Sequence, residues 1–392
     1  MKKYVVGGYV RDLLRNKHPN DKDFVVVGSS IQEMLSLGFH QVGKNFPVFL
    51  HPETKEEYAL ARTEKKTGNK HTDFIFNFSP TVSLYDDALR RDFTCNALAL
   101  DEETGEIIDY FQGYQDIKNK IIRVIDEKNF QTDPLRVLRA YRFSAVLNFK
   151  IDSKTKKILK KMVAREMLKF LTPQRVWQEI QKALAPGADS AVFFEGLAKI
   201  DGLKDWLPEL NQINAILPPS PPHTFKNKFK TAMRFLTQAK NTSDLVKWAI
   251  LIHNIDKKEP TFIDRLCNRL KVPNKYRDFA LIFFNNYKMI RKFEKMSFPK
   301  KYDFVKKISD NYKNKEKLES FLQGCYVIYH NNKPQNNINK ITTDIKKIYT
   351  IMNGITLKDL PQKQQEYLKK KNGSEFGKTY RNYMIRYLKS KL

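Results

Sequence analysis

The chain has 392 residues, more than one compact core usually holds, which predicts two to four domains. With 41% hydrophobic and 12% aromatic residues it can bury substantial cores, which excludes a largely disordered chain. Lys and Arg number 71 against 43 Asp and Glu, so the net charge of +28 favours a polyanionic partner such as nucleic acid or a membrane surface, although a coding bias towards Lys and Asn would give a similar excess.

The first 112 residues are predicted to form a small α+β domain, because short apolar runs alternate with polar turns. The predicted strands are "YVV" (4–6), "FVVVG" (24–28), "FHQVG" (39–43), "FPVFLH" (46–51), "EEYALAR" (56–62), "ALALD" (97–101) and "GEIIDYF" (105–111). Between the first two, "GGYVRDLLRN" (7–16) predicts a glycine turn that opens a short helix. The polar segment "TEKKTGNKHTDF" (63–74) predicts a mobile loop.

The remainder of the chain shows helical periodicity. "DPLRVLRAYRFSAVL" (133–147) and "TPQRVWQEIQKALA" (172–185) are predicted helices, the second with Thr172 as N-cap and Pro173 as first helical residue. The proline-rich segment "ILPPSPPH" (216–223) predicts a linker, and the chain after it is more basic and richer in Asn. We therefore predict three parts: an α+β domain over 1–112, a helical part over 113–215 and a basic helical tail over 216–392.

The cysteines and the N-terminus indicate the cellular compartment. Cys95, Cys267 and Cys325 lie far apart in the sequence and form no CxxC pair, so neither a disulfide framework nor a zinc site is expected. Arg11 and Asp12 interrupt the first apolar residues, and no window approaches 18 uninterrupted apolar residues. We expect a cytoplasmic protein without a membrane partner.

Two carboxylates open the second predicted strand. Asp21 and Asp23 are spaced i, i+2 in the run "NDKDFVVVGSS" (20–30), so in an extended chain their side chains point the same way. Paired carboxylates at this spacing favour Mg²⁺, and two such ions can activate an attacking hydroxyl and stabilise the leaving oxygen of a phosphoryl transfer. An Asp-x-Asp pair by itself is weak evidence, since about one is expected by chance in a chain of this length.

The preceding glycine turn strengthens this interpretation. Gly7 and Gly8 carry no Cβ and let backbone N–H groups approach phosphate oxygens, while Arg11 on the following helix favours anions. An ordinary strand-to-helix turn would also explain the two glycines. Together, the turn and the two acids predict a site for phosphoryl transfer.

Five segments in this order and spacing resemble one family, the class II tRNA nucleotidyltransferases or CCA-adding enzymes, with their relatives the bacterial poly(A) polymerases. The segments are "VGGYVRD" (6–12), "DKDFVVVG" (21–28), "RRDFTCNALAL" (90–100), "DPLRVLRAYRF" (133–143) and "TPQRVWQEI" (172–180). The CCA-adding branch is the more similar one over "QVGKNFPVFLHPETKEEYALARTEKKTG" (41–68). The resemblance weakens after about residue 220, where "DRLCNRLKVPN" (264–274) is a further match.

This resemblance implies a fold and a set of site residues. The fold would be a polymerase-β-like nucleotidyltransferase head with a small mixed sheet, followed by an all-α neck, body and tail. Asp21 and Asp23 would hold the catalytic metals, and Glu57 is a candidate third carboxylate, although Glu56 and Glu64 lie nearby and Glu57 could be a solvated strand acid. The residues expected to contact the incoming CTP or ATP are Gly8, Arg11, Arg91, Asp92, Asp133, Arg136 and Arg139. The loop at 63–74 corresponds to a segment that the family uses to switch from C to A addition.

The choice of base can be argued from Asp133 and Arg136. In a helix this i, i+3 pair lies on one face, where the carboxylate only accepts hydrogen bonds and the guanidinium only donates them. Cytosine and adenine both present an amino donor next to a ring-nitrogen acceptor, whereas uracil and guanine reverse the pattern, so the wrong base leaves buried polar groups unpaired, which can discriminate by roughly 10⁴ to 10⁵. A structural salt bridge is the alternative explanation. The family usually has Glu at the position of Thr132, which we expect still to cap the helix, and Arg139 and Arg142 continue the row.

The C-terminal half departs from the longer members of the family. Those members carry a metal-dependent phosphohydrolase domain with a His-Asp doublet, whereas this chain has His253 followed by Asn254. An amide is a poor metal ligand, so we expect a helical remnant that binds the tRNA backbone and has no hydrolase activity. His253 and His223 are then ordinary residues.

The sequence therefore predicts an enzyme that adds C, C and A to the 3′ end of tRNA from CTP and ATP with Mg²⁺, without a template. The alternatives are a poly(A) polymerase, an enzyme that adds only part of CCA, and a non-catalytic RNA-binding protein. No stable protein partner is expected.

Overall fold

The computed structural model describes the chain except for residues 20, 43–46, 67, 69–73, 216–227, 254, 256–260, 331–336, 356–357, 359 and 370–372. The predicted linker at 216–223, with His223, and also Asn254 lie outside the described residues. The chain forms two compact units, one of residues 1–183 and 188–211 and the other of 184–187 and 212–392. The first unit thus combines the α+β segment with the helices up to about residue 211, and the three-part division stays a prediction.

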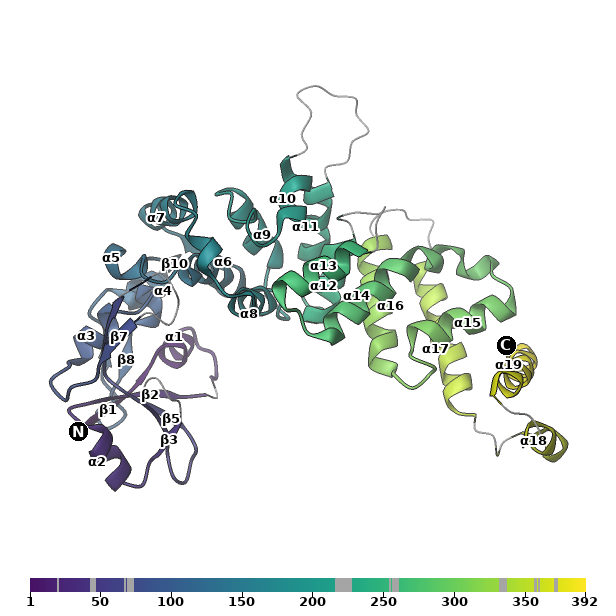
Figure 1. The fold of residues 1–392 in the computed structure, drawn as a ribbon, viewed down its shortest axis with the longest axis horizontal. Helices are drawn as coiled ribbons and strands as arrows, with labels where there is room; N and C mark the ends of the chain where they lie inside the picture. Colours follow the sequence, from purple (N-terminus) through teal and green to yellow (C-terminus); the bar gives the residue numbers. More distant parts are fainter. Residues whose placement is uncertain are drawn as a thin grey trace. The chain divides into compact units, whose positions relative to one another are not determined.

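The first unit contains a mixed sheet of seven strands in the order β3-β4-β5-β2-β1-β8-β9 (Figure 1). The strands are β1 (Lys2–Val6), β2 (Asp23–Val27), β3 (His40–Val42), β4 (Val48–Leu50), β5 (Glu57–Leu60), β8 (Ala99–Leu100) and β9 (Ile107–Ile108). Only β2 and β5 run parallel within this sheet. Each of the seven strands overlaps one of the seven predicted runs, although β1 begins two residues before its run and β2 begins one residue before its run.

Both faces of the central strands are buried. On one face Val6 and Val25 pack with Ala61 and with Leu84, which belongs to helix α3 (Leu84–Leu89). On the other face the ring of Phe24 stacks on that of Tyr58, with 4.2 Å between ring centroids. Burial on both sides explains why β2 is a continuous apolar run rather than an alternating one.

The segment at 63–74 was expected to be a loop, and this prediction is wrong for the ends that the structure describes. Thr63–Lys66 is strand β6, which pairs antiparallel with β7 (Phe74–Asn77) in a separate two-stranded sheet. The polar strand β6 gains its hydrogen bonds from β7, which begins at the last residue of the segment and contains Phe74, Ile75 and Phe76. Residues 67 and 69–73 lie outside the described residues.

Along the chain, the first three helices of the first unit lie between strands of the sheet, and the others follow its last strand. The helices are α1 (Gly8–Leu14), α2 (Ile31–Ser36), α4 (Gly113–Lys118), α5 (Glu127–Phe130), α6 (Leu135–Leu147), α7 (Ser153–Ala164), α8 (Pro173–Ala183) and α9 (Ser190–Ala198), besides α3 and the 3₁₀ turns η1 (Thr94–Asn96) and η2 (Met167–Phe170). Two short strands, β10 (Ile121–Ile122) and β11 (Lys150–Ile151), pair parallel. Helix α6 packs against both α8 and α9 and forms the centre of this region.

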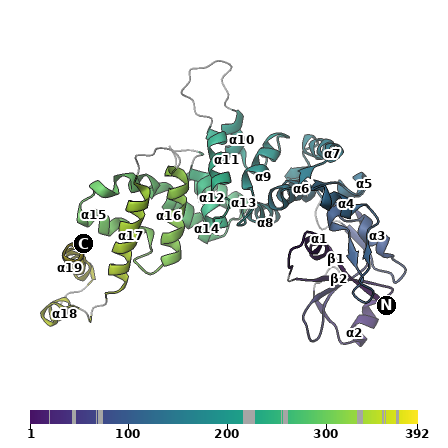
Figure 2. The same ribbon diagram turned by 180° about the vertical axis from the view of Figure 1, so that it is seen from behind.

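In the second unit the described regular secondary structure consists of helices joined by turns (Figure 2). Its elements are α11 (Lys228–Gln238), α12 (Asp244–His253), α13 (Thr261–Leu270), α14 (Asn274–Asn286), η3 (Tyr287–Lys295), α15 (Phe298–Ile308), α16 (Lys315–Tyr329), α17 (Ile338–Asn353), α18 (Gln362–Lys369) and α19 (Gly373–Lys391), while α10 (Pro208–Ala215) spans the division between the units. Helix α12 packs against α14 and α16 around the buried Trp248 and Phe283. His253 ends α12 as a core residue, in ring contact with Phe283 and Tyr287. Among the described helices, none has the length and apolar character needed to cross a bilayer.

Candidate active site

A cavity of about 510 Å³ in the first unit collects most of the residues singled out in the sequence. We call it the Asp23 cavity. Its lining is Gly7, Gly8, Arg11, Asp23, Glu64, Arg90, Arg91, Asp92, Asn96, Asp133, Leu135, Arg136, Arg139, Phe143 and Arg175. Six arginines and four acids therefore face one space, which gives an excess of positive charge suited to an anionic ligand.

The glycine turn lies at one wall of this cavity. Gly7 has φ of +76° and precedes the first residue of α1, a backbone conformation that side chains with a Cβ rarely adopt. A Cβ on Gly7 would lie 3.4 Å from Nη1 of Arg91, and one on Gly8 would lie 3.5 Å from Nη2 of Arg11. These are ordinary contact distances, so the backbone conformation of Gly7, rather than a lack of space, is what favours glycine in this turn.

Asp23 reaches the cavity as the first residue of β2. It pairs with Val6 of β1 and with Glu57 of β5, and the parallel register to Glu57 places both side chains on one face of the sheet. Loss of solvation raises the pKa of Asp23, Arg91 opposes this, and the nearby Asp21 raises the pKa further. Asp23 is thus a carboxylate that is harder to ionise than a fully solvated one.

These acids fit a bound cation in part. Within the parts of the chain that the structure describes, no hydrogen bond or ion pair holds the side chains of Asp21, Asp23 or Glu57. A hard cation would place positive charge beside the carboxylates of Asp21 and Asp23. The described residues contain no group of three or more acids, histidines or cysteines arranged to hold a metal, however, so Glu57 as a third ligand stays a prediction.

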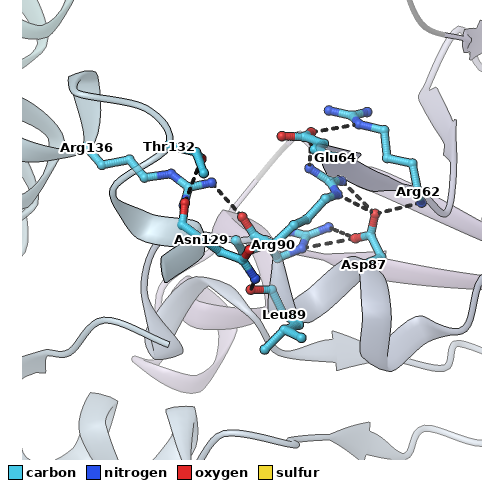
Figure 3. A network of polar contacts seen from close by, with 9 residues as sticks. Arg62, Glu64, Asp87, Leu89, Arg90, Asn129, Thr132 and Arg136 are labelled. Atoms are coloured by element: carbon cyan, nitrogen blue, oxygen red, sulfur yellow. Dashed lines mark hydrogen bonds and ion pairs between the residues drawn. The ribbon is translucent and has the colours of Figure 1, made fainter. Parts of the chain in front are cut away.

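A buried acid holds the two adjacent arginines of "RRDFT" (Figure 3). Asp87 is fully buried, with ion-pair distances of 2.6 Å to Arg90 and 3.0 Å to Arg91, and it accepts the backbone N–H of Arg62. Burial opposes the charge on Asp87, but Arg90 and Arg91 outweigh it and lower its pKa to about 2. Asp87 is therefore ionised at neutral pH and fixes both guanidinium groups at the cavity wall.

Glu64 connects the β6–β7 hairpin to the same arginines (Figure 3). One oxygen, Oε1, accepts hydrogen bonds from Nε of Arg62 at 2.9 Å and from Nη1 of Arg90 at 3.0 Å. The carbonyl of Arg90 in turn accepts a hydrogen bond from Arg136. A chain of contacts thus leads from β6 through Arg90 to the start of α6.

Asp92 organises a second network. Its Oδ2 accepts from Arg139 at 2.6 Å and its Oδ1 accepts from Asn96 at 3.1 Å, while Asn96 accepts from Arg11 at 2.7 Å. Burial opposes ionisation of Asp92, but the charges of Arg139 and Arg136 prevail and lower its pKa. Both oxygens of Asp92 are engaged, so it holds Arg139 and Arg11 in position.

Asp133 and Arg136 share the cavity but do not form the salt bridge considered above. Asp133 precedes the helix, and its oxygens accept from Arg175 at 2.8 and 3.3 Å and from the backbone N–H of Leu135. Arg136 donates to the carbonyls of Asn129, at 2.9 Å, and of Arg90. The prediction that one helix presents both residues is therefore wrong for Asp133, because Pro134 is the N-cap and α6 begins at Leu135.

Thr132 does not cap α6 as expected, since it lies two residues before the N-cap. Its hydroxyl donates to the carbonyl of Asn129 at 2.6 Å, and the side chain of Asp133 accepts from the first turn instead. Arg142 was expected to continue the row of Asp133, Arg136 and Arg139. It is instead buried in an ion pair with Glu179 of α8 and does not line the cavity. Its side chain holds α6 and α8 together.

Eight of the ten predicted site residues line the cavity, and Asp21 and Glu57 do not. The roles of all ten residues in nucleotide and metal binding stay predictions. Sequence reasoning gave no role to Asn96, Phe143 or Arg175 as site residues and named Glu64 only as an acid near the candidate Glu57, although each lies in or beside a quoted segment. Arg175 belongs to "TPQRVWQEI", where a charged residue in the first turn of an amphipathic helix could have been noticed.

Comparisons with known proteins agree on the family. The poly A polymerase head domain matches residues 3–123. A multifunctional CCA protein of Shewanella frigidimarina is 42% identical over 311 residues, covering 74% of each chain. One of Pasteurella multocida is 42% identical over 308 residues, covering 71% of this chain and 72% of that one.

Solved structures share the fold. The Bacillus stearothermophilus CCA-adding enzyme in complex with CTP has a TM-score of 0.67 at 23% identity, covering 98% of this chain and 87% of that chain. The Thermotoga maritima CCA-adding enzyme complexed with tRNA has a TM-score of 0.63 at 22% identity, with the same coverage. The expected head with a mixed sheet followed by helices is confirmed.

Proposed function

Because this chain belongs to the family of multifunctional CCA proteins, we propose that it adds C, C and A to the 3′ end of tRNA without a template. The terminal ribose hydroxyl attacks the α-phosphate of CTP or ATP, a new phosphodiester bond forms, and pyrophosphate leaves. The observation that carries the proposal is that one cavity holds Asp23, a cluster of arginines, and the pair Asp133 and Arg136.

The arginines suit the triphosphate. Arg11, Arg91 and Arg139 are each held by an acid or an amide, so their remaining N–H groups are oriented before the nucleotide arrives. A guanidinium that is already positioned loses little side-chain entropy on binding phosphate. We assign these three residues to the triphosphate, with Gly8 providing close approach of the backbone.

Asp21 and Asp23 would hold Mg²⁺, which supplies charge stabilisation to the phosphates and acidifies the attacking hydroxyl. The raised pKa of Asp23 supports this assignment, because a carboxylate that is difficult to ionise alone gains most from an added cation. A divalent metal is typical of this class of enzyme, and magnesium in particular is part of the proposal.

Asp133 and Arg136 are proposed to read the base. Arg175 uses some of the hydrogen-bond acceptor sites of the Asp133 carboxylate, and two backbone carbonyls use some of the N–H donors of Arg136. A carboxylate has about four acceptor sites and a guanidinium has five donors, so both side chains keep capacity for a base. The remaining acceptor can receive the amino group of C or A, and a remaining donor can meet the ring nitrogen. Uracil and guanine present the opposite pattern.

We further propose that the basic helical tail binds the tRNA backbone, and that the protein acts in the cytoplasm. All three cysteines are free and buried, which agrees with a reducing compartment. The tail has no assigned hydrolase site in this proposal.

Primer extension tests the function. Purified protein is given Mg²⁺, CTP, ATP and tRNAs that lack one, two or all three terminal nucleotides, and the products are sequenced. We expect addition that completes CCA and stops. Long A tails would instead support a poly(A) polymerase, addition of A or of CC alone would indicate a partial enzyme, and no extension by the wild type would contradict all three enzymatic functions.

The acids are tested in the same assay. Asp23→Asn and Asp21→Asn should each reduce extension by at least about 10³-fold while tRNA binding is retained, because a metal-assisted step depends on these carboxylates. Glu53→Gln, which changes an exposed acid outside the cavity, is the matched control. Extension at the wild-type rate in Asp23→Asn would exclude a catalytic role for Asp23.

A further inference from the structure

A second cavity, of about 800 Å³, lies in the same unit and shares no lining residue with the Asp23 cavity. Its lining includes residues from the end of α6, from β11, and from α7 and α9, and the two helices α7 and α9 lie near α6 in Figure 1. We call it the lysine cavity. Its residues have no part in the function proposed above.

The lysine cavity carries a large uncompensated charge. Six lysines line it, and Glu195 is the one acid in its lining. The lysines are Lys120, Lys150, Lys156, Lys157, Lys160 and Lys199, and all six are exposed. Within the described part of the chain none of them forms an ion pair or a hydrogen bond through its side chain. The arginines of the Asp23 cavity, in contrast, are held by acids, amides or carbonyls.

The floor of the lysine cavity is apolar. It includes Tyr141, Phe149, Ile151, Val192 and Ile200. Gly196 of α9 makes room for the Tyr141 ring, because a Cβ at Gly196 would lie 2.1 Å from the ring carbon Cδ1. The size of this hollow is within the range of small-molecule sites. Phosphate contacts alone would leave the apolar floor unused.

These two properties define a ligand with a flat apolar body and several negative charges. A nucleoside triphosphate has both, since its base can lie on the apolar floor and its phosphates can reach the lysines. Lys156 and Lys160 are spaced i, i+4 on α7, and Lys157 and Lys160 are spaced i, i+3, so one stretch of helix presents three ammonium groups to one ligand. We propose that the lysine cavity is a second nucleotide-binding site of this protein.

The second site should bind nucleotide without transferring it. Glu195 is the one carboxylate among the described residues of its lining, so the pair Asp21 and Asp23 has no counterpart here. Lysine presents a mobile point charge without the fixed, forked donor geometry of arginine. We therefore expect the triphosphate to contribute more to the binding affinity than the base does. ATP and GTP should therefore bind this cavity with affinities within about tenfold of each other.

Equilibrium dialysis of labelled ATP, with the full chain and no tRNA, tests the proposal. At saturation the wild type should bind two ATP per chain, and the variant K156E/K160E should lose one of them. The control K154E/K161E makes the same charge change on the same helix at two exposed residues outside the cavity, and it should retain both. Thermal unfolding of each variant checks that these exposed substitutions leave the fold intact.

The outcomes separate this proposal from the function proposed above. A wild-type count of one that falls to zero in K156E/K160E supports the second site and contradicts nucleotide binding in the Asp23 cavity. Equal counts in the wild type and K156E/K160E would overturn the second site. The same would follow if K156E/K160E weakened binding of a single-stranded RNA oligonucleotide while the ATP count stayed unchanged, because the lysines would then belong to an RNA surface.

Discussion

At the scale of single residues, two buried acids hold arginines of the Asp23 cavity in position. Asp92 and Asp87 are both buried and each holds two neighbouring groups of the Asp23 cavity. Their arginines are thereby kept at fixed positions against their own repulsion. Removing such an acid should affect nucleotide binding and folding together.

Asp92→Asn is the first test at this scale. The amide keeps the size of the side chain but not its charge, so Arg139 loses the partner that holds it. We expect the KM for ATP to rise about tenfold and the free energy of unfolding to fall by about 3 kcal/mol, as for one partner removed from a buried ion pair. Steady-state extension and urea unfolding measure the two effects, and Glu53→Gln should change neither. An unaltered KM would contradict a role for Asp92 in nucleotide binding.

The lowered pKa of Asp87 predicts that the free energy of unfolding depends on pH under acidic conditions. Its pKa is depressed from 3.8 to about 2, so its ionised form stabilises the fold above pH 4, and this contribution is lost as the pH falls from about 4 to 2. The contribution corresponds to about 2 kcal/mol at neutral pH. The free energy of unfolding of the wild type should exceed that of Asp87→Asn at pH 7, and the difference should narrow between pH 4 and 2. A difference that is constant over this range would contradict the assignment.

At the scale of elements, α6 connects the site to the rest of the first unit. Arg136 and Arg139 on α6 face the Asp23 cavity, Arg142 pairs with Glu179 of α8, and Tyr141 lies against α9. A shift of this helix would move the arginines that we assign to the nucleotide. Its packing should therefore matter for the geometry of the site as well as for stability.

Gly196→Ala tests the packing of α6 on α9. The added Cβ would overlap the buried ring of Tyr141, so we expect the free energy of unfolding to fall by about 1–3 kcal/mol, as for other overpacked cores. Gly377→Ala is the matched control, because it lies in α19 with nothing within 4 Å of the new Cβ. That change should be neutral or stabilise by up to about 1 kcal/mol. Equal changes in the free energy of unfolding for the two substitutions would show that α9 can move away from Tyr141 without loss of stability.

At the scale of the whole molecule, the net charge of +28 governs the encounter with tRNA. Neutralising phosphates releases counterions, so log Kd should rise linearly with the logarithm of the salt concentration. If about six phosphates are contacted, the affinity should fall roughly 10³-fold between 50 and 200 mM salt. Filter binding with labelled tRNA measures the slope, and an equimolar neutral solute is the control. A flat dependence would contradict binding through the phosphate backbone.

Much of the fold could be predicted because its signals are local. Each of the seven sheet strands overlaps a short run with apolar residues that polar turns separate from the next, and "GGYVRDLLRN" contains both the turn and the helix that follow β1. Strand β6 was missed because its residues are all polar, and only pairing with β7 makes it a strand. The composition of Thr63–Lys66 cannot report a hydrogen-bonding partner that begins only at Phe74.

The sequence by itself determined which residue types are available for phosphoryl transfer, because the acids, glycines and arginines occur in ordered segments with characteristic spacing. Only the tertiary structure decided which partner each charge has: Asp133 with Arg175, Arg139 with Asp92, and Arg136 with two carbonyls. The lysine cavity likewise emerges only when α7, α9 and β11 meet beside α6. The physical reason is that spacing along a chain limits only near neighbours, whereas ion pairs and cavities depend on distances between segments far apart in sequence.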